Sequence, residues 1–188
     1  ILQTQRVGHA GTLDPMANGV LLMCIGNATR VTEYLQDHDK TYRARVRLGI
    51  ETDTYDATGA IVSERPLSTS PQQIEKAVRS FIGKLKQTPP IYSAIKQQGT
   101  PLYKLARRGA DVQVDARAVE IYAIEELNVD LPAIEFTIRC SKGTYIRSLA
   151  HDLGEKLGCG AHLAALTRLA SGEFTLETAL TPDQLREV

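Results

Sequence analysis

Residues 42–50 alternate between apolar and basic side chains, and this pattern places the tightest restriction on the fold. A period of two is that of a β-strand with one face in the core and the other in water. One face carries Tyr42, Ala44, Val46, Leu48 and Ile50, and the other carries Arg43, Arg45 and Arg47. The chain must therefore build a sheet with a buried face, and other segments must cover that face.

Other segments show strand or helix patterns that do not alternate regularly along the chain. Strands are expected at 20–25, where a short apolar run suggests a buried strand, and at 119–127 and 134–140. Helices are expected at 28–35, 70–82, 101–108, 144–157 and from Thr181 onward. Because strands and helices mix without βαβ repetition, the predicted class is α+β rather than doubly wound α/β.

Local signals mark several of these helix ends. Ser70 and Gln73 have the spacing of a capping box, and Pro71 suits the first turn of a helix. Gly83, Gly109 and Gly158 follow the expected helices and are suited to end them.

The formal net charge is zero, but basic residues are concentrated in one part of the chain. No acidic residue lies between Glu75 and Asp111. Tyr92 and Tyr103 are interleaved with the basic residues there, as suits stacking on nucleic-acid bases. The basic side chains in this interval are Lys76, Arg79, Lys84, Lys86, Lys96, Lys104, Arg107 and Arg108. A polyanion-binding surface is one interpretation, and a solvated basic face is the other.

Several classes of protein are disfavoured by what the sequence contains. No apolar run is long enough to span a membrane. Three widely spaced cysteines, Cys24, Cys140 and Cys159, argue against a disulfide framework and for a reducing cytoplasm. The acidic residues of 51–56 could bind magnesium, although turn hydrogen bonds explain them more simply.

Residues 8–15, with the sequence GHAGTLDP, are the strongest candidate for a functional loop. Gly8, Gly11 and Pro15 surround Asp14 and favour a tight loop that a ligand can approach closely. On spacing alone, a turn in which Asp14 caps a following helix is the favoured explanation of the stretch.

The same stretch resembles the signature GHxGxLDPxAxGxLxxxxGxAT of the bacterial TruB family of tRNA pseudouridine-55 synthases, matched from Gly8 to Thr29. Further family motifs follow in order. They are DKTY at 39–42, TDTYDATG at 52–59, QTPPIYSAIK at 87–96, YKLARRG at 103–109, CSKGTYIRSL at 140–149 and GAH at 160–162 leading to Arg168. The resemblance covers essentially the whole chain. It implies the pseudouridine synthase fold, with a mixed, mainly antiparallel central sheet flanked by helices and RNA-binding loops.

The resemblance also implies catalytic roles. Asp14 would be the nucleophile that attacks the target nucleoside, so that uracil is detached, turned and rejoined through carbon. Tyr42 would stack on the uracil and serve as the base that removes a proton late in the reaction. Arg147 would pair with Asp14 and orient it.

The remaining implied residues bind substrate. Tyr145 and Leu166 would line the uracil pocket, and His9 would hold the RNA where the flipped base leaves its stack. Arg30, Lys142 and a basic segment at about 84–110 would contact phosphates. Tyr145 and Arg147 are two residues apart, so both reach the pocket only if the chain there is extended or at the start of a helix.

For the chain as a whole, the resemblance implies one catalytic domain over residues 1–188, incomplete at its N-terminus and without a PUA-type domain. It also implies no cofactor, no metal, no membrane and no obligatory protein partner. A monomer acting on the T stem-loop of tRNA in the cytoplasm is the expectation. Three alternatives stay open: another structured RNA as substrate, a non-catalytic RNA-binding domain, and a magnesium-dependent phosphotransferase or hydrolase using Asp14, Asp53 and Asp56.

Overall fold

The computed structural model describes residues 4–97, 99–106, 108 and 113–187. Its centre is a seven-stranded sheet with the strand order β13-β12-β4-β11-β10-β7, to which β2 is added beside β12. These strands are β2 (Asn18–Gly19), β4 (Lys40–Leu48), β7 (Gly83–Gln87), β10 (Arg117–Asp130), β11 (Ala133–Cys140), β12 (Ala161–Ser171) and β13 (Phe174–Thr175). All the pairings are antiparallel except that of β2 with β12, which confirms the predicted α+β class and mainly antiparallel sheet.

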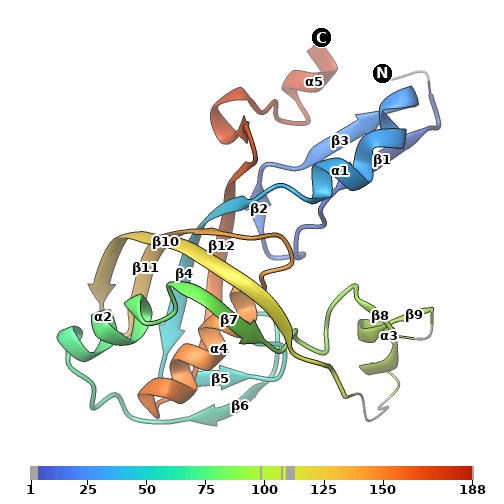
Figure 1. Ribbon diagram of the computed structural model, residues 1–188. Helices are drawn as coiled ribbons and strands as arrows, with labels where there is room; N and C mark the ends of the chain where they lie inside the picture. The colour runs from blue at the N-terminus through green and yellow to red at the C-terminus, as the bar shows by residue number, and fades with distance from the viewer. Residues whose placement is uncertain (1–3, 98, 107, 109–112, 188) are drawn as a thin grey trace.

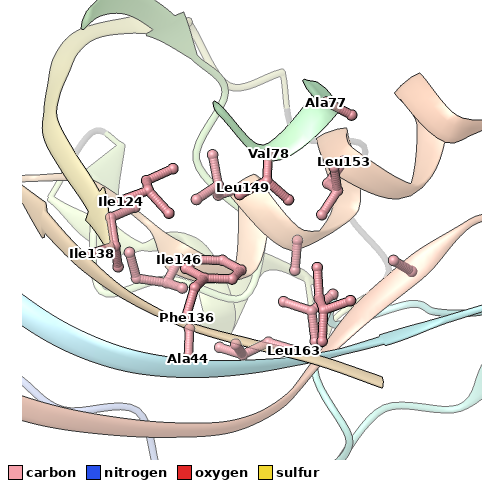
Figure 2. Packing of buried hydrophobic residues seen from close by; sticks show 14 of the residues in the cluster. Ala44, Ala77, Val78, Ile124, Phe136, Ile138, Ile146, Leu149, Leu153 and Leu163 are labelled. Carbon is pink, nitrogen blue, oxygen red and sulfur yellow. The ribbon is translucent and has the colours of Figure 1, made fainter. Parts of the chain in front are cut away.

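Two helices, α2 (Pro71–Arg79) and α4 (Ile146–Leu157), cover the same face of this sheet (Figure 1). Figure 2 shows Val78 and Leu149 meeting above Phe136 and Ala44 of the sheet. The predicted capping box forms at Ser70, and Gly158 ends α4 in the left-handed conformation with φ of 73°. Helix α2 therefore begins, and α4 ends, where the sequence indicates. The expectation that Gly83 ends the first of these helices is wrong, because α2 ends at Arg79 and Gly83 begins β7.

The predicted alternation of β4 is confirmed. Ala44, Val46 and Leu48 are buried, whereas Arg43 and Arg45 are exposed on the opposite face of the sheet. The expected strand does not continue to Ile50, because Gly49 has a φ of +86° and turns the chain. Ile50 instead begins β5 (Ile50–Thr52), which pairs with β6 (Ile61–Glu64).

A smaller unit, made by β1 (Val7–Ala10), β3 (Leu22–Ile25), the 3₁₀ helix η1 (Gly26–Val31) and α1 (Thr32–Gln36), stands away from the sheet (Figure 1). The expectation of a buried strand at 20–25 is wrong for most of β3, since only Cys24 is buried there and Met23 is half exposed. The helix expected at 28–35 divides into η1 and α1, and Tyr34 of α1 is exposed.

A second projection is formed by the segment that connects β7 to β10 along the chain (Figure 1). It contains β8 (Lys96–Gln97), β9 (Thr100–Pro101) and α3 (Leu102–Ala106). Gly109, expected to end this helix, and Arg107 lie outside the described residues. The chain closes with the 3₁₀ helix η2 (Leu176–Thr178) and α5 (Gln184–Glu187). No helix within the described ranges is long and apolar enough to cross a membrane.

Candidate active site

A cavity of about 820 Å³ opens where β4 and α4 begin. Its walls come from the loop 11–15, residues of 54–58, the segment 92–95, the turn 143–147 and strand β12. The loop 11–15 follows β1 of the smaller unit, which is the first projection from the sheet. The segment 92–95 belongs to the second projection. Both projections therefore border the cavity, and the central sheet contributes Tyr42 of β4 and Leu166 of β12 to its lining.

Asp14 lies in this cavity and is bound by Arg147. The Nε of Arg147 donates to Oδ2 of Asp14 at 2.9 Å, and Nη2 donates to Oδ1 at 2.7 Å. This two-pronged geometry fixes the plane of the carboxylate as well as its position. No helix follows Asp14 for it to cap, so the turn interpretation of this loop is wrong for the side chain. The pairing expected from the resemblance is present.

Arg147 is held from several sides, in the first turn of α4. Its Nη2 donates to the carbonyl oxygen of Tyr92 at 3.1 Å, and Nη1 donates to that of Thr54 at 3.4 Å. Nη1 also lies 3.6 Å from Oδ2 of Asp56. The side chains of Arg147 and Asp56 are 5% and 6% exposed, whereas that of Asp14 is 28% exposed. The guanidinium is thus buried, and the Asp14 carboxylate stays accessible to a substrate.

Tyr145 and Arg147 both face the cavity because the chain changes conformation between them. Tyr145 is the N-cap of α4, with φ of −101° and ψ of 110°, and is therefore extended. The side chain of Gln87 fixes this backbone by accepting from the Tyr145 N–H at 2.8 Å and donating to its carbonyl at 3.0 Å. Burial raises the pKa of the Tyr145 hydroxyl.

Tyr42 forms another wall, next to Leu166, which is 6% exposed on β12. Burial raises the pKa of the Tyr42 hydroxyl to about 12, and the charge of Asp14 acts in the same direction. The positive charge of Arg168 opposes this rise. At neutral pH the Tyr42 ring is therefore a neutral, polar-tipped aromatic surface, suited to stacking on a flat base.

Lys40 and Arg168 are not among the site residues expected from the sequence, yet both line the cavity and are buried. Burial, together with the charge of Arg168, lowers the pKa of Lys40. A signal was present in the sequence. Lys40 lies two residues before Tyr42, and Arg168 lies two residues after Leu166, so a period of two puts each on the site face of its strand.

Comparison with known proteins gives this geometry a family. Residues 1–146 match the model of the TruB family pseudouridylate synthase N-terminal domain, and residues 147–188 match that of the tRNA pseudouridylate synthase B C-terminal domain. This chain belongs to the TruB family. The join between the two TruB models falls at the first turn of α4, so Asp14 comes from one matched segment and Arg147 from the other.

Curated TruB relatives are similar along the whole chain. It is 53% identical to tRNA pseudouridine synthase B of Cupriavidus metallidurans over 187 residues, 98% of this chain and 60% of that protein. It is 47% identical to tRNA pseudouridine synthase B of Geobacter sulfurreducens over 188 residues, 100% of this chain and 62% of that protein. The chain thus spans about 60% of the length of these relatives.

Solved structures share the fold. One is the Cbf5-Nop10-Gar1 complex, with a TM-score of 0.72 and 32% identity, over 97% of this chain and 45% of that one. Another is an H/ACA RNP bound to a substrate RNA containing 2'-deoxyuridine, with a TM-score of 0.69 and 29% identity, over 96% of this chain and 43% of that one. The pseudouridine synthase fold expected from the sequence is confirmed by these neighbours.

Three residues assigned to substrate binding lie outside the cavity lining. His9 is exposed on β1, and Arg30 is exposed on η1. Lys142 is exposed beside the rim and forms an ion pair with Asp37 at 2.7 Å. Contact of these residues with RNA stays a prediction.

The acidic residues of 51–56 are occupied by protein groups. Asp53 accepts from the N–H of Ala60 at 2.8 Å, and Glu51 pairs with Arg65 at 2.9 Å. Oδ1 of Asp56 accepts from the hydroxyl and the N–H of Thr58. Within the described residues, no group of three or more His, Cys, Asp or Glu side chains is arranged to hold a metal ion. These contacts favour turn formation as the explanation of the acidic residues.

Proposed function

We propose that this protein is a tRNA pseudouridine synthase that isomerises the T-loop uridine at tRNA position 55. The observation that carries the proposal is the accessible Asp14 carboxylate, fixed by the Arg147 fork in a cavity that Tyr42 flanks. The family and the curated relatives support the same reaction. The cavity volume is within the range of about 300–1,000 Å³ typical of small-ligand sites, so an extruded nucleoside can be accommodated.

In the proposed reaction, Asp14 forms a bond to the nucleoside, and the bond between N1 of uracil and C1′ of ribose breaks. The base turns and C5 bonds to C1′, while the bond to Asp14 breaks and regenerates the carboxylate. The C5 proton leaves, and N1 gains a proton. The product is an isomer of the substrate, so the reaction needs no cofactor. Arg147 supplies orientation, since its fork holds both carboxylate oxygens.

The RNA must expose the target base, which costs a few kcal/mol of stacking and pairing. Stacking on one aromatic ring returns about 1–3 kcal/mol. Tyr42 is the ring proposed for this role, with Tyr145 and Leu166 as the other walls. Because burial raises the pKa of Tyr42 to about 12, the stacking role is favoured over that of a proton acceptor at neutral pH.

The proposed RNA-binding surface combines the two projections that border the cavity. The second projection exposes Lys96, Lys104 and Arg108. The smaller unit of β1, β3, η1 and α1 exposes His9 and Arg30. Lys84 and Lys86, at the start of the proposed basic segment 84–110, lie exposed on the edge strand β7. A T stem-loop placed between the projections would meet positive charge on both sides. We place this activity in a cytoplasmic monomer that needs no obligatory protein partner.

The test is pseudouridine formation on an unmodified tRNA transcript, mapped with carbodiimide, for the full-length wild type and Asp14→Asn. Asp53→Asn is the matched control, because Asp53 is an exposed loop aspartate that is absent from the cavity lining. Product at the T-loop uridine with wild type and control, and none with Asp14→Asn, is expected. Absence of product from folded wild type would reject the tRNA assignment. Product from Asp14→Asn would reject Asp14 as the nucleophile.

A further inference from the structure

Arg168 stands out because it is a fully buried cation without an acidic partner. It is 1% exposed, and among the described residues it is the largest fully buried side chain. Among the residues that the structure describes, no carboxylate lies within ion-pair distance of it. A buried charge is costly unless hydrogen bonds compensate it. Its bonds should therefore reveal what the fold gains from it.

Those bonds go to both ends of the loop that carries Asp14. The Nε of Arg168 donates to the carbonyl oxygen of Val20 at 2.6 Å, and Nη2 donates to that of Gly11 at 3.0 Å. Asp14 lies between these two carbonyls in the chain. A planar guanidinium keeps its donors in a fixed relation, so one side chain sets the separation of the two loop ends.

The backbone of Arg168 holds the same loop. The N–H of Val20 donates to the Arg168 carbonyl at 2.9 Å, and β2 runs parallel to β12 there. Gly19 has a φ of +101°, and a Cβ at this position would overlap the carbonyl oxygen of Arg168. The loop therefore approaches β12 as closely as backbone atoms allow.

Arg168 also adjoins the aromatic wall of the site. It is the direct cross-strand partner of Tyr42 on β4, and both side chains line the cavity. Residues directly opposite in an antiparallel pair share a face and lie within about 5.5 Å. Arg168 thus contacts the loop that carries Asp14 and is also the cross-strand neighbour of Tyr42.

We propose that Arg168 is a positioning residue that fixes the Asp14 loop relative to Tyr42, so that the attacking carboxylate and the stacked base are held in register. This inference rests on the proposed function for its consequence in catalysis. A side chain that only stabilised the fold would not need to span both loop ends at the site. Misplacement of a reacting group by about 1 Å costs about 100-fold in rate.

The decisive variant is Arg168→Lys, which keeps the charge but cannot bridge the two carbonyls. Single-turnover pseudouridine formation is expected to slow by about 100-fold, with RNA affinity within about threefold of wild type. Arg45→Lys is the matched control, because Arg45 is exposed on the other face of β4, and it is expected to react at the wild-type rate. Adding guanidinium ion to Arg168→Ala should restore part of the rate and leave wild type unchanged.

A second variant moves the loop without altering the guanidinium. Gly19→Ala must push the loop away from β12, and it should slow the chemical step while RNA still binds. Hydrogen exchange gives a readout that does not depend on activity. Amides of residues 11–20 should exchange faster in Arg168→Lys than in wild type, while those of β10 and β11 stay protected.

The outcomes separate the inference from the proposed function. Inactive wild type with the expected change in exchange would reject the reaction and retain the loop-holding role. Active wild type together with an equally active Arg168→Lys would overturn the inference. A parallel loss of rate, affinity and global protection, without guanidinium rescue, would also overturn it, because Arg168 would then be merely structural.

Discussion

Replacing Arg147 by Met is expected to abolish product formation and to weaken the fold by a calculable amount. The substitution removes a 5%-exposed cation and leaves Asp14 and Asp56 around its empty position. Removing one partner of a buried ion pair costs about 3–5 kcal/mol. Because Asp14 is 28% exposed and water can reach it, the lower part, about 3–4 kcal/mol, is expected. At about 2–4 °C per kcal/mol, Tm should fall by roughly 6–16 °C.

Thermal unfolding followed by circular dichroism measures this loss, and carbodiimide mapping measures product. Arg79→Met is the control, since Arg79 pairs with Glu75 at 2.9 Å on the exposed face of α2. An exposed pair of this kind contributes about 0.3–0.5 kcal/mol, so its Tm should change by less than about 2 °C. Equal Tm values for the two variants would refute the reasoning from burial. Arg147→Lys should recover stability more than activity, because it restores charge without the fork.

Three further changes test other parts of the structure. Asp56→Asn places an amide against the Arg147 donors and should lower single-turnover rates about 10–100-fold with little change in RNA affinity; an unchanged rate would remove Asp56 from the site. The Tyr42 pKa of about 12 in the folded protein lies above the ordinary value of 10.0, so the neutral side chain stabilises the folded state. This contribution to the free energy of unfolding is lost as pH rises from 10 to 12. Tyr42→Phe lacks this loss, and its Tm relative to wild type should rise over about pH 9–11.5; parallel curves would contradict the raised pKa. In Gly154→Ala the new Cβ overlaps the backbone nitrogen of Ala161, so urea unfolding should show a loss of about 1–3 kcal/mol rather than the gain that helix propensity alone predicts.

Much of the fold was predictable because its signals are local. The alternation in β4, the capping box at Ser70 and the left-handed Gly158 each act over a few residues, and all three are found as expected. Strand β12 was not assigned from periodicity, although it lies beside β4 in the sheet. Its register is interrupted between Leu163 and Ala165 and again between Arg168 and Ala170, so its side chains do not alternate over the full length.

The site was predictable only in part, because its members come from distant segments. Asp14 and Arg147 are 133 residues apart, and their pairing was inferred from family resemblance rather than from spacing. The extended N-cap at Tyr145, which allows Tyr145 and Arg147 to share the cavity, depends on the side chain of Gln87. No local rule connects Gln87 to a turn 58 residues later.

The charge of the site shows why composition alone was a poor guide to its partner. The chain has a formal net charge of zero, yet the cavity lining described here holds three cations, Lys40, Arg147 and Arg168, against two carboxylates, Asp14 and Asp56. Both carboxylates are already engaged by Arg147, and the hydrogen bonds of Lys40 and Arg168 go to carbonyl oxygens. Such a cavity attracts a ligand that carries negative charge next to a neutral ring. A uridine within an RNA backbone has that combination, whereas a free uracil base does not.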